Sequence, residues 1–140
     1  MTPDLVLTDA AGSDDRDAIL RELIAFNEAS VGPSGARPLA VLLRDPATAR
    51  TVGGLWGRTS FDWLYVELLV VPERLRGAGF GRALLGTAER EARARGCAGI
   101  WLDTFDFQAR GFYEKLGFEV FGSIPGHPRG RERFFLSKTF

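Results

Sequence analysis

A loop of glycines flanked by arginines is the part of the sequence whose residue types most clearly predict chemistry. The loop runs from Arg76 to Arg82 and contains Gly77, Gly79 and Gly81, between a stretch typical of a buried strand and one typical of a helix. Glycines let backbone N–H groups point inward without Cβ clashes, and the start of a helix carries a positive partial charge. The loop therefore predicts an anion site for a phosphate or a pyrophosphate.

The charge distribution supports an anionic ligand at this loop. The net charge is zero, from 18 Lys+Arg and 18 Asp+Glu, but residues 74–96 carry six arginines and two glutamates. Pairs at i,i+4 spacing, such as Glu89 and Arg93, explain part of this block as a solvated helix face. They do not explain Arg76 and Arg82, which flank the glycines and favour an anion.

The residues after the glycines narrow the kind of phosphate site. A P-loop requires Gly-Lys-Ser/Thr, whereas Arg82 and Ala83 follow Gly81. A dinucleotide fingerprint requires a further glycine at Arg82, and Asp103 fits its ribose-binding acid only superficially. The chain is also too short for a dinucleotide fold with a substrate domain. A nucleotide-binding protein of either type is therefore disfavoured.

Length and composition exclude several other classes of protein. A chain of 140 residues predicts one domain over 1–140, and zero net charge argues against a nucleic-acid partner. No apolar run reaches the roughly 20 residues of a membrane span, and the N-terminus lacks a signal-peptide pattern. Cys97 and His127 are the only residues of their kinds, so neither a disulfide nor a Cys/His metal site is expected. We expect a cytoplasmic protein without a metal or a membrane partner.

Apolar periodicity predicts the elements that position the loop. Helical spacing predicts helices over 14–29, 79–95 and 109–116. Strands are predicted over 4–8, 39–44, 50–60, 63–71, 98–104, 118–123 and 133–139. In 63–71, Tyr65, Glu67 and Leu69 share one face, and apolar residues on both faces predict a central strand covered on both sides. This order predicts a mixed α/β sheet with helices on its faces.

Two motifs identify a family. Residues 70–85 contain Arg76-x-x-Gly79-x-Gly81, and residues 109–118 contain a Tyr-Glu-Lys-x-Gly-Phe run that begins at Tyr113. In order and spacing they resemble the acyl-CoA-binding motif and the second signature of the GCN5-related N-acetyltransferase (GNAT) superfamily. The resemblance implies a GNAT-like α/β (α+β) fold, with a mixed, mostly antiparallel central sheet of about seven strands and helices on both faces.

The resemblance also implies acetyl-CoA as the co-substrate. Loop amides would hold its pyrophosphate, and the backbone of the strand at 63–71 would pair with pantetheine by strand addition. Relatives often carry an Asn seven residues before the tyrosine, whereas this chain has Asp106, which cannot donate as Asn does. Gln108 or a main-chain group is the alternative donor. The implied cofactor-binding residues are Leu69, Val70, Val71, Arg76, Gly77, Ala78, Gly79, Phe80, Gly81, Arg82, Asp106 and Ala109.

Two residues are candidates for catalysis. Tyr113 matches the tyrosine that protonates the departing thiolate in many relatives, although its apolar helix face equally fits a core residue. Glu67, among aromatic side chains, is a candidate general base that acts directly or through water, and its alternative is an ion pair. Asp103 and His127 are alternative bases. The candidates for contact with the acceptor are Glu28, Trp56, Trp63, Asp103, Phe105 and His127.

These features together predict an enzyme that moves an acetyl group from acetyl-CoA to a primary amine, by direct attack in a ternary complex. The alternative is a catalytically silent acyl-CoA-binding domain. The acceptor, a small-molecule or peptide amine, is not readable from the sequence. Members of the family often dimerise, and the aromatic residues of this chain permit a homodimer.

Overall fold

The computed structural model describes residues 1–140, which divide into two compact units, Met1–Ser34 and Gly35–Phe140. The first unit contains the helix α1 (Ser13–Val31), so the predicted helix at 14–29 is confirmed. Its start is stabilised by Asp15, whose carboxylate accepts a hydrogen bond from the Gly12 amide at 3.0 Å. The prediction of one domain over 1–140 stays a prediction.

The strand predicted at 4–8 does not form. Leu5, Val6 and Leu7 have no regular secondary structure and are almost fully exposed. A strand needs a neighbour for its backbone hydrogen bonds, and the Met1–Ser34 unit contains no strand that could pair with this segment. The alternation of residue types predicted the wrong structure here because pairing is not a local property.

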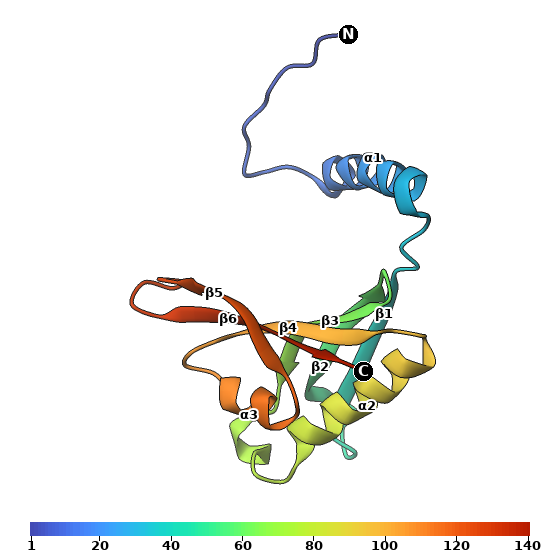
Figure 1. Ribbon diagram of the computed structural model, residues 1–140. Helices are drawn as coiled ribbons and strands as arrows, with labels where there is room; N and C mark the ends of the chain where they lie inside the picture. Colours follow the sequence, from blue (N-terminus) through green and yellow to red (C-terminus); the bar gives the residue numbers. More distant parts are fainter. The chain divides into compact units, whose positions relative to one another are not determined.

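The second unit is built on one mixed sheet of six strands in the order β1-β2-β3-β4-β6-β5 (Figure 1). All neighbouring strands are antiparallel except β3 and β4, which are parallel. The predicted fold class is therefore confirmed, with six strands in place of about seven. The strands are β1 (Arg37–Arg44), β2 (Thr51–Ser60), β3 (Trp63–Val70), β4 (Gly99–Phe105), β5 (Glu119–Pro125) and β6 (Glu132–Thr139).

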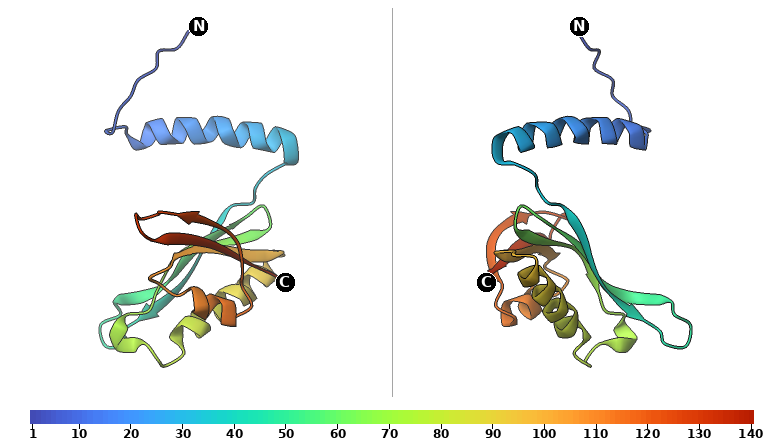
Figure 2. Two further views of the ribbon diagram at one scale, coloured as in Figure 1. Left: turned by 60° about the vertical axis from the view of Figure 1, so that its left-hand side comes forward. Right: turned by 90° about the vertical axis from the view of Figure 1, so that its right-hand side faces the viewer.

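Two helices of this unit lie on the same side of the sheet (Figure 2). The helix α2 (Phe80–Ala94) follows the short 3-10 turn η1 (Glu73–Leu75) and makes the crossover from β3 to the parallel strand β4. The shorter helix α3 (Arg110–Lys115) joins β4 to β5. No helix of the structure has the length and apolar character needed to span a membrane.

The core between α2 and the sheet anchors the glycine loop. The buried residues of α2 recur at helical spacing, and residues of β2, β3, β4 and β6 that face them are almost fully buried. This packing holds the first turn of α2 in a fixed position beside the end of β3. The residues concerned are Leu84, Leu85, Ala88 and Ala92 on α2, with Leu55, Leu64, Ile100, Leu102 and Leu136 on the strands.

A β-bulge at Glu67 interrupts the regular alternation of β3. Val66 pairs with Gly57 of β2 and Leu68 pairs with Trp56, so Glu67 is an extra residue without a partner. Before the bulge, the even-numbered residues are buried. After it, Leu69 packs against the core, whereas Leu68 is 62% exposed and Val70 53% exposed. The predicted alternation is wrong beyond Glu67, whereas the expectation of a strand covered on both faces stays a prediction.

Candidate functional site

The site begins where β3 and β4 separate. They pair only at Trp63–Gly99, Leu64–Ile100 and Tyr65–Trp101, and then diverge. The divergence opens a cleft of about 900 Å³ at the carboxyl ends of both strands. Four parts of the chain line the cleft: the end of β3 with Val71 (66–71), the loop and the start of α2 (75–82), the end of β4 with the following turn (102–109), and the separate residues Phe112, Tyr113 and Arg133. Within these ranges, Ala78 and Asp106 do not line it.

Two different structural reasons explain why glycine occupies these three positions of the loop. Gly77 and Gly79 have φ angles of +83° and +84°, which other residues adopt only with strain. Gly81 has an ordinary φ, but a Cβ there would lie 3.0 Å from Cζ of Phe112. Two glycines therefore shape the loop, and the third allows α3 to approach the start of α2.

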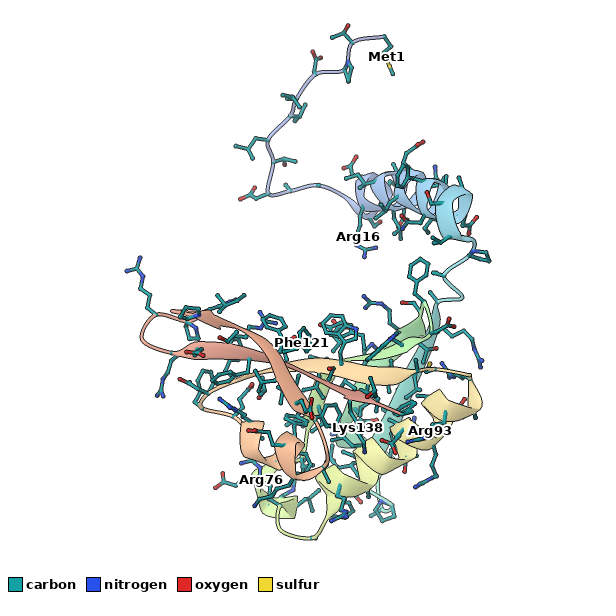
Figure 3. The ribbon with its side chains drawn as sticks, in the orientation of Figure 1. Met1, Arg16, Arg76, Arg93, Phe121 and Lys138 are labelled. Carbon is teal, nitrogen blue, oxygen red and sulfur yellow. The ribbon has the colours of Figure 1, made fainter.

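This loop leaves a row of backbone donors without partners. None of the amides from Gly77 to Arg82 donates a hydrogen bond within the protein, and the first amide of α2 that does so is that of Ala83, to Gly79 O at 3.0 Å. Arg76 donates from Nε to Val71 O at 3.0 Å, which ties the loop to the end of β3 (Figure 3). The amides and the start of the helix form a site that favours an anion.

Tyr113 is at once a core residue and a cleft residue. Its side chain is buried, and its ring packs edge-to-face against Phe112 and Phe118 at 5.2 and 5.8 Å. Burial raises the pKa of Tyr113 to about 12, and the negative charge of Asp103 adds to this effect. The phenol is therefore protonated at neutral pH and can donate a hydrogen bond into the cleft.

The two candidate carboxylates of the cleft differ in their partners. Asp103 Oδ1 accepts hydrogen bonds from Nε and Nη2 of Arg133, at 2.9 and 2.6 Å, and the pair links β4 to β6. Glu67 is exposed at the bulge and forms no ion pair, so the ion-pair alternative considered for it is wrong. Of the two, Glu67 is the one free to accept a proton from a bound group.

Most residues predicted from the motifs meet in this cleft, but two lie outside its lining. Ala78 belongs to the loop without lining the cleft. Asp106 instead ties the turn after β4 to β6, because its amide donates to Glu132 O at 2.9 Å and its carboxylate accepts from Glu132 N at 3.2 Å. Those that line the cleft are Glu67, Leu69, Val70, Val71, Arg76, Gly77, Gly79, Phe80, Gly81, Arg82, Asp103, Phe105, Ala109 and Tyr113.

The residues predicted to contact an acceptor are more scattered. Phe105 lines the cleft, and the ring of His127 lies edge-to-face with it at 5.7 Å. Trp63 lies at the opposite end of β3, against Gly99, and Trp56 is half-exposed on β2; neither lines the cleft. Glu28 belongs to α1 in the Met1–Ser34 unit, and its role stays a prediction.

Several cleft residues were not among the predicted site residues, and three of them have polar or aromatic contacts in the cleft. Gln108 Oε1 accepts hydrogen bonds from Thr104 Oγ1 and from the Phe105 amide, which fixes the turn after β4. Phe107 stacks on Phe105 at 5.3 Å. Arg133 reaches the cleft from β6, 30 residues from its partner Asp103. Its local sequence carries no signal of that pairing.

Comparisons with known proteins agree with this architecture. The model of the acetyltransferase (GNAT) family matches residues 14–118. An acetyltransferase of Agrobacterium fabrum is 42% identical over 135 residues, which cover 96% of this chain and 98% of the relative. The blasticidin-S acetyltransferase of Streptomyces morookaense is 42% identical over 106 residues, covering 74% and 78%. The crystal structure of an Agrobacterium tumefaciens protein assigned to the acetyltransferases has a TM-score of 0.93 and 40% identity, covering 99% of this chain and 100% of its own.

The fold and these relatives define the class of protein as an acetyltransferase. Within that class, the chain belongs to the acetyltransferase (GNAT) family, whose model matches well over half of its length.

Proposed function

We propose that the protein is an acetyl-CoA-dependent N-acetyltransferase that acts on a primary amine by direct attack in a ternary complex. The observation that carries the proposal is the row of unpartnered amides from Gly77 to Arg82, at the end of a cleft that also contains Tyr113 and Glu67. Anion donors, a proton donor and a free carboxylate in one cleft are the groups that transfer from a CoA thioester requires.

The residues present fit acetyl-CoA. The loop amides would hold its pyrophosphate. Beyond Tyr65, the edge of β3 that faces β4 has no strand partner, so Leu69 and Val71 can offer backbone groups to the pantetheine amides. A structural neighbour from Bacillus anthracis, with a TM-score of 0.61 and 24% identity, was solved in complex with acetyl coenzyme A.

Glu67 is the proposed general base. An amine is mostly protonated at neutral pH and must lose a proton before its nitrogen can form a bond to the thioester carbon. The bulge places this carboxylate at the mouth of the cleft without a cation to neutralise it. Glu67 would accept that proton directly or through water.

Tyr113 is the proposed donor to the leaving sulfur. As the C–N bond forms and the C–S bond breaks, negative charge appears on the thiolate. The pKa of the Tyr113 phenol, raised to about 12, is higher than the pKa of an ordinary thiol, which is about 8.5. Complete transfer of the phenol proton to the thiolate is therefore uphill. Tyr113 would therefore act mainly by donating a hydrogen bond, while the cleft holds the reactants together.

The acceptor class is proposed from one relative. The blasticidin-S acetyltransferase shares 42% identity over 74% of this chain, which favours a small-molecule amine over a protein amine. The cleft offers aromatic surface at Phe105 and Phe107 beside the carboxylate of Glu67, which suits a cationic amine.

Release of free thiol from acetyl-CoA, measured with a panel of small amines and peptides, tests the function. We expect thiol release that requires both acetyl-CoA and an amine, and acetylated amine detected by mass spectrometry. Tight binding of acetyl-CoA without thiol release for any amine would instead identify an acyl-CoA-binding domain without catalysis.

A further inference from the structure

Two phenylalanine rings form part of the lining of the cleft at the turn after β4. Phe105 ends β4 and Phe107 follows it, and their rings are nearly parallel, at 3°, with centroids 5.3 Å apart. Both residues line the cleft, and neither belongs to the hydrophobic core. We refer to these two rings as the aromatic platform. Because Phe107 is 54% exposed, burial on folding does not explain why a phenylalanine stands there.

Hydrogen bonds hold the backbone of the aromatic platform in place. The Phe105 amide donates to Gln108 Oε1 at 2.8 Å, and the Gln108 amide donates to Phe105 O at 3.0 Å. A second pair of bonds joins Asp106 to Glu132 of β6: the Asp106 amide donates to Glu132 O at 2.9 Å, and the Glu132 amide donates to Asp106 Oδ2 at 3.2 Å. The two rings are therefore fixed before a ligand arrives, so a group that stacks on them pays little ordering entropy.

The two rings differ in how much of their surface is open. Cζ of Arg133 lies 5.2 Å from the centroid of Phe105, and the ring of His127 meets Phe105 edge-to-face at 5.7 Å. Phe107 is approached by Arg131, whose Cζ lies 5.6 Å from the ring centroid and whose side chain is itself 55% exposed. The aromatic surface that the cleft offers to a ligand is therefore mainly that of Phe107.

The charges near Phe107 differ from those near Glu67. The only ion-pair contact of Arg131 is a long one, 3.8 Å from its Nη1 to Oδ1 of Asp106. A second positive charge beside Phe107 would be repelled by this weakly paired guanidinium. An uncharged planar ring would not be, because a guanidinium stacks favourably on the face of a π-system. The positive amine of an acceptor fits Glu67 instead, the free carboxylate of the same cleft.

We infer that the aromatic platform binds a planar unsaturated ring of the acceptor. The preferred acceptors are then primary amines joined by an aliphatic chain to an aryl or heteroaryl ring, and Phe107 determines this specificity. The inference deepens the proposed function and rests on it, with the amine nitrogen at Glu67 and the ring on Phe107. No bond forms or breaks at the platform, so the preference should appear in the KM of the acceptor more than in kcat.

Acetylation of phenethylamine and of cyclohexylethylamine by the full chain tests this, with thiol release from acetyl-CoA as the measurement. The two amines have the same aliphatic chain and a ring of the same size, but only phenethylamine has a π-face. We expect the kcat/KM of wild type to be about fivefold higher for phenethylamine, which is the typical size of an aromatic pair interaction beyond its burial.

Three variants separate the ring of Phe107 from other effects. Phe107→Leu keeps an apolar side chain without the ring, and should bring the two kcat/KM values within about twofold of each other. Phe107→Tyr keeps the ring and should retain the preference. The matched control is Phe121→Leu, because Phe121 is a 60% exposed phenylalanine of β5 that does not line the cleft (Figure 3). This control should also retain the preference. All three variants should melt at the wild-type temperature, since both positions are exposed.

The possible failures are distinguishable. Equal kcat/KM for the two amines in wild type, or a preference that persists in Phe107→Leu, overturns the aromatic platform as the specificity site but leaves the proposed function standing. The same holds if wild type acetylates linear diamines better than either ring amine, because the platform then binds a cation. Absence of thiol release with every amine of the wider panel overturns the proposed function itself.

Discussion

The two halves of the β3–β4 pair differ although they belong to the same strands. In the first half the strands pair, Leu64 and Ile100 are almost fully buried, and the rings of Tyr65 and Trp101 stack at 4.1 Å. In the second half the strands diverge, Glu67 forms a bulge, and the backbone beyond it faces the cleft. The first half stabilises the fold, whereas the second half leaves polar groups open to a ligand.

We expect the largest effect of a single substitution on CoA binding, at the loop beside the half where β3 and β4 diverge. Gly79→Glu should abolish detectable CoA binding, because it places a negative charge among the loop amides and strains a residue with φ of +84°. Binding can be measured by thermal shift with CoA. Gly96→Glu is the matched control, because Gly96 has φ of +81° and lies beyond the other end of α2. The Gly96→Glu variant should lose a similar amount of stability but still bind CoA. Unchanged CoA binding in Gly79→Glu would contradict the assignment of the loop.

The next largest effect is expected on stability, in the half where β3 and β4 are paired. Leu64→Ala should lower the free energy of unfolding by about 3 kcal/mol, because it removes a fully buried side chain and leaves a cavity. Leu68→Ala, four residues along the same strand but 62% exposed, should change it by less than about 0.5 kcal/mol. Urea denaturation measures both. Similar losses would show that the two halves are packed alike.

Glu67→Gln should lower kcat by about a hundredfold at neutral pH, the usual contribution of a general base. The deficit should shrink as the pH approaches the pKa of the acceptor amine, because the amine then loses its proton without help. A kcat profile against pH measures this. Asp103→Asn is the control, since Asp103 is occupied by Arg133. A larger loss in Asp103→Asn than in Glu67→Gln would reverse the assignment of the base.

Tyr113→Phe should lower kcat by about tenfold, with little change in CoA affinity, because it removes one hydrogen-bond donor to the leaving sulfur. It should also change stability in alkali. The folded pKa of about 12 lies above the ordinary tyrosine pKa of about 10, so the associated stability is present below about pH 10 and is lost as the pH rises through about 12. That difference corresponds to about 3 kcal/mol. Unfolding of wild type and variant between pH 9 and 12 measures it, and parallel curves would contradict the burial of Tyr113.

The glycine loop and the helix after it were predicted from the sequence because their causes are local. The requirement for positive φ at Gly77 and Gly79 is read within a few residues, and the apolar spacing of α2 is read within its own length. The interpretation of Tyr113 as a core residue is confirmed, and the residue also lines the cleft; its role as a proton donor to the thiolate stays a prediction.

The errors share a different cause. The carboxylate of Asp106 accepts a hydrogen bond from the Glu132 amide, 26 residues away, which the motif did not indicate, and its contact with the cofactor stays a prediction. The alternation of β3 was extended through Glu67, but the bulge exists only in register with β2. The strand expected at 4–8 has no partner strand within its own unit, Met1–Ser34. In each case the outcome depends on a segment distant in the sequence.

The sequence by itself determined the conformation of the glycine loop, the helices and most strands, and the family, because backbone conformation and apolar periodicity are short-range properties. Only the tertiary structure decided where β3 and β4 separate, that Asp103 is paired with Arg133 while Glu67 is free, and that Arg131 lies against the ring of Phe107. These features arise from strand register and helix packing, which bring together residues that no local pattern connects.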